Sequence, residues 1–166
     1  MAPQLRGGGQ ERGLRAGTEN VPAIAGFGIA ADLASQDLKQ VDRLAQLRDQ
    51  MEARCSVASQ DLVVVGADSI RLPNTSCLAR PGMISETLVM ALDLAGVAVS
   101  AGSACSSGKV RRSAVLDAMG LADMSAHAIR VSLGWATSST DVDRFVEAWT
   151  GLRSRSKAAS PALETV

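Results

Sequence analysis

The sequence predicts an α+β domain, in which helices pack against a small and partly antiparallel sheet. Amphipathic helical patterns and short β-branched runs alternate along the 166 residues. Some of the segments between them are too short for the crossover that joins parallel strands, which favours antiparallel pairing. The composition, with 46% apolar and 20% charged residues, is that of an ordinary globular protein.

The N-terminal part begins with a glycine-rich segment and continues into two predicted helices. Residues 5–20 hold three arginines and no hydrophobic period, so we expect a loop there. Pro22 suits the first turn of a helix, and the small side chains of residues 23–34 allow this helix to pack closely. A second helix is expected where apolar residues recur at helical spacing: Leu38, Val41, Leu44, Ala45, Met51 and Cys55.

Strands and shorter helices alternate farther along the chain. A helix is expected to be capped by Ser85 and stopped by Gly96. A short helix over residues 113–119 is expected to end at Gly120. Apolar or β-branched runs predict four strands, at residues 62–65, 75–78, 97–100 and 129–133.

The last predicted helix follows a recognisable start signal. Ser138 and Asp141 have the spacing of a capping box. Beyond them, apolar residues share one helix face: Val142, Phe145, Val146, Trp149 and Leu152. The polar tail after Arg153 is expected to be frayed.

Charge and composition argue against several functions. A formal net charge of zero removes the electrostatic argument for nucleic acid or an anionic membrane, and 2% aromatic residues disfavour base stacking. The apolar stretch of residues 21–31 is too short to span a bilayer, and the N-terminus lacks a secretory signal pattern. Three dispersed cysteines form neither a disulfide framework nor a zinc motif, so we expect no metal site and a reducing, cytoplasmic location.

Cys105 is the sharpest candidate for chemistry. It lies among the small residues 100–108, so its thiol is expected to be exposed, and the cations that follow would favour the thiolate. An exposed loop cysteine without a role explains the local composition equally well. Cys55 extends an apolar helix face and Cys77 lies in a predicted strand, and we interpret both as small core residues.

Two further features are suited to binding anions. The glycine-rich loop of residues 5–20 could cradle a phosphate with its N–H groups and arginines, although a linker between domains would have the same composition. Arg130 lies within an apolar strand, where its planar guanidinium suits a carboxylate. A salt bridge to an internal acidic residue is the alternative for Arg130. His127, the single histidine, is assigned no role.

Three segments together resemble the group I cysteine desulfurases, which are enzymes of the class V aminotransferase family with pyridoxal 5'-phosphate (PLP). Residues 7–20, Gly-Gly-Gly-Gln-Glu-Arg-Gly-Leu-Arg-Ala-Gly-Thr-Glu-Asn, resemble the stretch that follows the cofactor lysine. Residues 100–108, Ser-Ala-Gly-Ser-Ala-Cys-Ser-Ser-Gly, resemble the active-cysteine loop, and residues 129–134, Ile-Arg-Val-Ser-Leu-Gly, resemble the strand of the substrate arginine. The order and separations also agree, from about residue 5 to residue 152.

The resemblance implies a fold and a division into domains. The fold would be the small C-terminal domain of a fold-type I PLP-dependent transferase. Residues 1–20 would belong to the large cofactor domain, and residues 21–155 would form the small domain with the active-cysteine loop. Residues 156–166 would be a flexible tail.

The resemblance also implies an activity, which is transfer of sulfur from L-cysteine to Cys105 as a persulfide, with release of alanine, for iron–sulfur cluster assembly. Arg130 would bind the substrate carboxylate, and Thr18 would reach the PLP phosphate of the neighbouring subunit in a homodimer. The partners would be L-cysteine, a large PLP-domain partner or second subunit, and a sulfur-acceptor scaffold protein. No metal ligand is implied, although the Cys105 persulfide could transiently contact an iron–sulfur cluster.

One part of the family pattern is missing. The family attaches PLP to a lysine that follows a histidine, and none of Lys39, Lys109 and Lys157 does so. We therefore expect that the large domain lies outside this chain and that the chain alone is inactive, as a truncated product or half of a split enzyme. The alternatives are a sulfur-relay or partner-binding fragment, a remnant without function, and a selenocysteine lyase-like enzyme.

Overall fold

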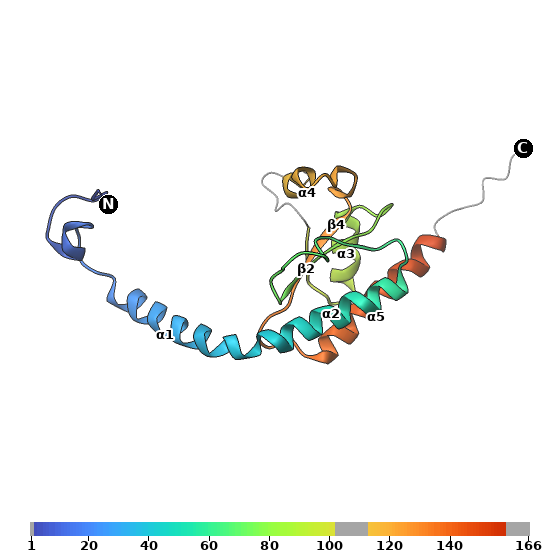
Figure 1. Cartoon of the computed structure of the whole chain (residues 1–166), viewed down its shortest axis with the longest axis horizontal. Helices are drawn as coiled ribbons and strands as arrows, with labels where there is room; N and C mark the ends of the chain where they lie inside the picture. Colours follow the sequence, from blue (N-terminus) through green and yellow to red (C-terminus); the bar gives the residue numbers. More distant parts are fainter. Residues whose placement is uncertain (1, 102–112, 159–166) are drawn as a thin grey trace, which may run out of the picture. The chain divides into compact units, whose positions relative to one another are not determined.

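The computed structural model describes residues 2–101 and 113–158, with side chains placed as far as Leu152. It confirms an α+β architecture of helices and a four-stranded antiparallel sheet (Figure 1). Packing divides the chain into two units, Met1–Lys39 and Gln40–Val166. The assignment of residues 1–20 to a large cofactor domain stays a prediction.

The first unit consists of the glycine-rich loop and one helix. The loop contains the short 3-10 helix η1 (Gln10–Gly13) and a bridge that joins Leu5 to Arg15. Helix α1 (Val21–Asp37) begins after Asn20, whose side chain accepts a hydrogen bond from the Ala23 N–H at 3.2 Å. Pro22 lies in its first turn, as predicted. No described residue of this unit is buried.

The 3-10 turn η2 (Leu38–Gln40) spans the boundary between the two units, and the second unit is built around the sheet. The strands are arranged in the order β1-β2-β4-β3. Their bounds are β1 (Val63–Val64), β2 (Thr75–Ala79), β3 (Ser100–Ala101) and β4 (Ala128–Ser132). Each matches a predicted strand except β3, which lies at the end of the expected stretch 97–100, because only its last residue and Ala101 pair with β4.

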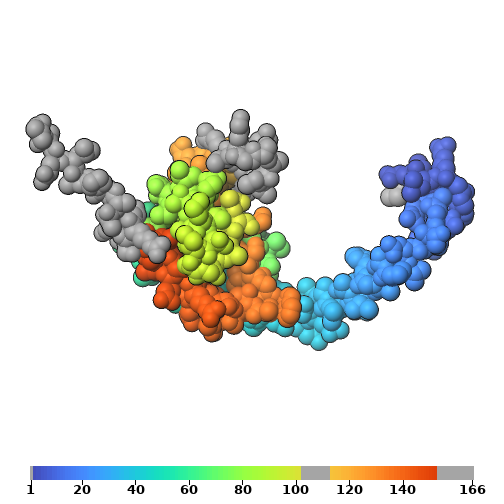
Figure 2. Space-filling view, turned by 180° about the vertical axis from the view of Figure 1, so that it is seen from behind, coloured from blue at the N-terminus to red at the C-terminus, as the bar shows by residue number. Residues whose placement is uncertain are grey.

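Three helices cover one face of the sheet: α2 (Val41–Ala58), α3 (Ser85–Leu94) and α5 (Ser139–Ala158). Helices α2 and α5 lie alongside each other (Figure 1), and Figure 2 shows the yellow-green atoms of α3 next to the orange-red atoms of α5. The main core lies between these helices and the sheet and includes Met51, Cys55, Leu78, Leu88, Ile129, Val131, Phe145 and Trp149. Cys55 is therefore a core residue, as predicted.

The opposite face of the sheet is only partly covered. The short helix α4 (Ala114–Ala118) and the 3-10 turn η3 (Ala122–Met124) pack there. They form a second, smaller core of Val65, Ala79, Leu116 and Ala128. The side chain of Ser113 caps α4 by accepting from the Leu116 N–H at 3.4 Å, and Gly120 follows with a left-handed φ of 76°, as the sequence predicted.

Of three further predicted helix ends, two are correct. Ser138 and Asp141 form the capping box, with the Ser138 N–H donating to Asp141 Oδ2 at 2.9 Å. Gly96 follows α3 with a φ of 77°. Ser85, however, does not cap α3. Ile84 occupies the cap position, and Ser85 is buried as the first helical residue, because its N–H donates to the Ala126 carbonyl at 2.9 Å.

The ends of the chain add two points. Helix α5 extends to Ala158, and residues 159–166 of the expected tail lie outside the described residues. In the described part of the chain, no helix combines the length and the apolar character needed to cross a membrane.

The two tryptophans test where the core lies. Trp149 is fully buried, its indole N–H donates to Ser59 Oγ at 3.1 Å, and Phe145 stacks on it at 6.1 Å. Trp149→Ala should lower the free energy of unfolding by about 3–5 kcal/mol, because it leaves a cavity and an unpaired hydroxyl. Urea denaturation followed by far-UV circular dichroism measures the loss. Trp135, 74% exposed, is the matched control, and an equal loss for Trp135→Ala would contradict this packing.

Candidate functional site

The candidate site lies on the partly covered face of the sheet, beside α4. In β4, Ile129 and Val131 point into the main core, so the pleat turns Arg130 to the opposite face. A cavity of about 310 Å³ lies there. Residues of β2, β4, α4 and the β1–β2 loop line it, among them Arg71, Thr75, Cys77, Ser113, Leu116 and Arg130.

Arg130 is exposed at this cavity rather than buried within the strand. The alternative interpretation, a salt bridge to an internal acidic residue, is not found, because no ion pair of Arg130 occurs among the described residues. Its guanidinium is therefore available to a ligand in the cavity. A planar group with parallel N–H donors binds a carboxylate through two hydrogen bonds.

Cys77 packs against the smaller core, as predicted, but it is not fully enclosed there. It is half-buried, pairs with Arg130 across the β2–β4 ladder and lines the cavity. Burial raises the pKa of its thiol, while the charge of Arg130 acts in the opposite direction. Strand alternation was the signal that could have revealed this, since Leu78 points into the main core and Cys77 must face the other way. Cys55, by contrast, is fully buried, and burial raises its pKa to about 12.

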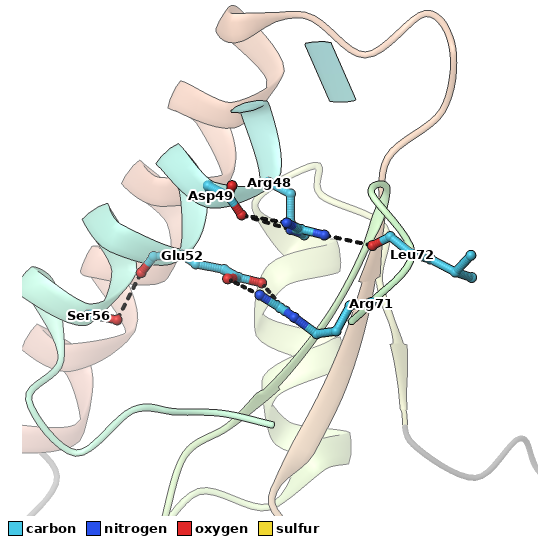
Figure 3. Close-up of polar contacts among 6 residues, drawn as sticks. All are labelled: Arg48, Asp49, Glu52, Ser56, Arg71 and Leu72. Atoms are coloured by element: carbon cyan, nitrogen blue, oxygen red, sulfur yellow. Dashed lines mark hydrogen bonds and ion pairs between the residues drawn. The ribbon is translucent and has the colours of Figure 1, made fainter. Parts of the chain in front are cut away.

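Arg71 is a second guanidinium at the cavity, and no local pattern in the sequence indicated it. Its two terminal nitrogens donate to the two carboxylate oxygens of Glu52 on α2, at 2.7 and 3.0 Å (Figure 3). Arg48, one turn earlier, donates to the Leu72 carbonyl at 2.7 Å (Figure 3). These two contacts fasten the β1–β2 loop, which forms one wall of the cavity, to helix α2.

The Glu52–Arg71 pair is almost removed from water, with the two side chains 11% and 17% exposed. Burial raises the pKa of Glu52, but the hydrogen bonds and charge of Arg71 outweigh it and hold that pKa below its usual value of 4.5. The same hydrogen bonds raise the pKa of Arg71. Arg71 is thus neutralised by its partner, whereas Arg130 is not, and the cavity offers one free positive group among the described residues.

Cys105 belongs to residues 102–112, which lie outside the described residues. The residues on either side of this segment are described. Ser100 of β3 pairs with Arg130, and Ala101 is the last residue before the segment. Ser113, directly after it, is buried and lines the cavity. The Cys105 segment therefore ends at the cavity and begins one residue after the strand partner of Arg130.

Thr18 lies in the first unit and is exposed. The neighbouring Arg15 donates to the carbonyl oxygens of Gly17 and Thr18 at 3.5 and 3.2 Å. Within the same loop, Glu11 and Arg12 adopt left-handed backbone angles, with φ of 52° and 57°. Such strain in residues other than glycine is concentrated at functional sites.

Two remaining predictions concern histidine and metals. His127, to which no role was given, lies within hydrogen-bonding distance of the Met83 carbonyl, at 3.0 Å from Nδ1. Among residues 2–101 and 113–158, no group of three His, Cys, Asp or Glu side chains is placed to hold a metal ion.

Comparison with known proteins gives consistent matches. The family model for class-V aminotransferases matches residues 4–145. The chain is 40% identical to a cysteine desulfurase of Gluconacetobacter diazotrophicus over 97% of this chain and 41% of that protein. A cysteine desulfurase of Cereibacter sphaeroides is 43% identical over 96% of this chain and 41% of its own length. The chain thus spans about two fifths of these relatives.

Solved structures agree with the sequence matches. A NifS-like protein from Rickettsia africae superposes with a TM-score of 0.78 at 30% identity, over 92% of this chain and 40% of that one. DndA from Streptomyces lividans matches 79% of this chain and 36% of its own, with a TM-score of 0.54 and 36% identity. These matches to NifS-like proteins confirm the expected α+β fold, that of part of a fold-type I PLP-dependent transferase.

The Glu52–Arg71 pair makes stability depend on pH in a defined direction. Because folding lowers the pKa of Glu52, its contribution is complete above pH 4.5 and is lost as the pH falls through the lower folded-state value. Glu52→Gln should cost about 2 kcal/mol of unfolding free energy at pH 7 and less in acid. Urea titrations at several pH values measure both effects. Asp143→Asn, at the exposed Arg54–Asp143 pair, should change little, and a pH-independent loss for Glu52→Gln would contradict the pKa assignment.

Proposed function

The chain belongs to the class-V aminotransferase family, and from this we propose that it supplies the sulfur-accepting and carboxylate-binding part of a PLP-dependent cysteine desulfurase. Relatives named cysteine desulfurase match nearly its whole length. The observation that carries the proposal is the position of Arg130. It has no ion-pair partner among the described residues and lines a cavity with Ser113, the residue after the Cys105 segment, while Ser100, just before that segment, pairs with it in the sheet.

Arg130 is proposed to bind the carboxylate of L-cysteine. Its guanidinium has no ion-pair partner among the described residues, and a pair of parallel hydrogen bonds would fix the substrate in one orientation. Arg71 does not compete for the carboxylate, because Glu52 holds it at 2.7 Å. The cavity thus favours a ligand with a single carboxylate.

Cys105 is proposed to accept the sulfur. Its thiolate attacks the sulfur of L-cysteine, so that a sulfur–sulfur bond forms as the carbon–sulfur bond of the substrate breaks. The electron pair of the broken bond stays on the substrate carbon, which takes up a proton and leaves as alanine. Cys105 follows Ala101 by four residues, and this short connection limits how far its thiol can lie from Arg130.

Enzymes of this family use PLP, which supplies an electron sink for negative charge on the substrate. The first unit fits one part of such a site. Thr18 offers an exposed hydroxyl in a strained, arginine-containing loop, and we propose that it contacts the PLP phosphate of a neighbouring subunit in a homodimer. No lysine of the sequence follows a histidine, so covalent attachment of the cofactor is assigned to a large domain, to which residues 1–20 would also belong.

The sulfur of the persulfide is proposed to pass to a scaffold protein for iron–sulfur cluster assembly in the cytoplasm. The support for this role is the resemblance of residues 100–108 to the active-cysteine loop of enzymes that serve such assembly. Two described cysteines, Cys55 and Cys77, are free thiols, which is usual in reducing compartments.

The assignment of Cys105 can be tested by mass spectrometry of the purified chain. With L-cysteine and PLP alone, the chain should form no persulfide and release no alanine. A lysine-bearing large domain should restore both, and Cys105→Ser should abolish the persulfide. Turnover by the chain alone would contradict the proposal. Sulfur taken by Cys105 from another protein's persulfide, without alanine release under any condition, would favour the sulfur-relay alternative.

Arg130 can be tested by kinetics in the same reconstituted enzyme. Arg130→Lys keeps the charge but loses the paired hydrogen bonds. This loss should cost about 2 kcal/mol of binding free energy and so lower kcat/KM for L-cysteine about thirtyfold. The loss should lie mainly in KM, because the contact already exists in the bound substrate. Arg54→Lys, at an exposed ion pair remote in sequence, is the control. An unchanged KM would remove Arg130 from the substrate site.

A further inference from the structure

We propose that the cavity beside Arg130 is a binding site for short monocarboxylates with an apolar body, and that an ammonium group on the same molecule weakens their binding. Binding to the chain rests on the residues that line the cavity. Competition between such acids and L-cysteine would follow from it, and this consequence rests on the proposed function.

Apolar side chains form most of the cavity wall. Val65, directly after β1, and Leu116 of α4 are buried there and belong to the smaller core. Val115 and Met119 line the same cavity but are 69% and 50% exposed, so they lie at its rim. Cavities of this kind bind through apolar surface that is removed from water, while a few polar groups fix the orientation of the ligand.

Most polar groups at the cavity already have partners within the chain. The Thr75 hydroxyl donates to Asn74 Oδ1 at 3.3 Å, and the Ser113 hydroxyl accepts from a backbone N–H of α4 at 3.4 Å. Arg71 is held in its ion pair with α2. Arg130 has no ion pair among the described residues, so it is the charged group that can recognise a ligand. A single carboxylate matches it.

The charge of the cavity disfavours an ammonium group. None of the described residues that line the cavity is acidic, whereas two are arginines. Arg130 would repel a cation next to the carboxylate that it binds, and the ammonium would lose water without gaining an acceptor. The amino group of L-cysteine therefore needs a partner outside the described residues, while an acid without an amino group needs none.

The cavity also has room for a body larger than that of L-cysteine. Its volume is about 310 Å³, about twice that of an apolar cavity of about 150 Å³ that holds benzene. L-Cysteine is about the size of benzene, so it would leave part of the apolar wall uncovered. A branched aliphatic body, such as that of isocaproate, would cover more of this wall.

A matched set of ligands tests the proposal on the full chain without added cofactor. Isocaproate and L-leucine share one carbon skeleton and differ in the ammonium group, and acetate keeps the carboxylate without the body. In NMR titrations, isocaproate should bind about 10- to 150-fold more tightly than acetate, as expected for one buried aliphatic side chain. It should bind at least about tenfold more tightly than L-leucine. Isocaproate that bound no more tightly than either of the others would overturn the proposal.

Three variants locate the binding site. Arg130→Gln should weaken isocaproate binding at least about tenfold, because it removes the charge. Met119→Ser should weaken isocaproate about three- to tenfold and leave acetate unchanged, because it removes apolar wall. The matched control is Met90→Ser, at a methionine of α3 that is 65% exposed and absent from the cavity wall. Equal effects at the two methionines, or full binding by Arg130→Gln, would contradict the proposal. The near-ultraviolet signal of buried Trp149 reports whether each variant is folded.

Enzyme kinetics separate this site from the proposed function. In the enzyme reconstituted with a large domain, isocaproate should inhibit competitively with L-cysteine. If isocaproate bound the chain through Arg130 and did not compete with L-cysteine, the proposed role of Arg130 in the reaction would be wrong and the monocarboxylate site would stand. If KM for L-cysteine depended on Arg130 and isocaproate did not bind, the monocarboxylate site alone would be wrong.

Discussion

The alternation of side chains along β4 determines both the core and the candidate site. Ile129 and Val131 enter the main core, so Arg130 between them must face the opposite side of the sheet. A shift of the strand by one residue would bury the guanidinium in hydrocarbon and expose the isoleucine. The free energy that fixes the register of β4 thus also fixes the orientation of Arg130. Folding and the proposed role of Arg130 therefore depend on the same strand register.

The cavity wall opposite β4 is held by a different kind of interaction. Glu52 and Arg48 on α2 fasten the β1–β2 loop through charged hydrogen bonds (Figure 3). Because Glu52 neutralises Arg71, Arg130 is the one arginine lining the cavity without an ion pair in the described part of the chain. The apolar core thus positions β4 on one side of the cavity, and the Glu52–Arg71 ion pair positions the β1–β2 loop on the other.

Local signals in the sequence predicted much of this fold. The face of α5, the capping box at Ser138 and the glycine ends of α3 and α4 are all as expected, because each depends on neighbouring residues. The prediction that Ser85 caps α3 was wrong, because the Ser85 N–H bonds to the carbonyl of Ala126, which is distant in the sequence. Contacts between distant residues carry no local pattern, and the Glu52–Arg71 pair could not have been foreseen for this reason. The family resemblance indicated Arg130 and Cys105 as candidate site residues, but it did not indicate which residues lie around them.

The contrast between the two tryptophans gives the chain a built-in optical readout. The sequence contains no tyrosine, so near-ultraviolet absorption and emission arise almost entirely from Trp135 and Trp149. Trp149 is enclosed by the main core, while Trp135 is exposed on the turn before α5. The guanidinium of Arg43 donates a hydrogen bond to the backbone carbonyl of Trp135 at 2.7 Å. Their emission should fall at different wavelengths, and a soluble quencher should reach only one. Events at the β4–α5 turn can therefore be followed separately from events in the core, without an added label.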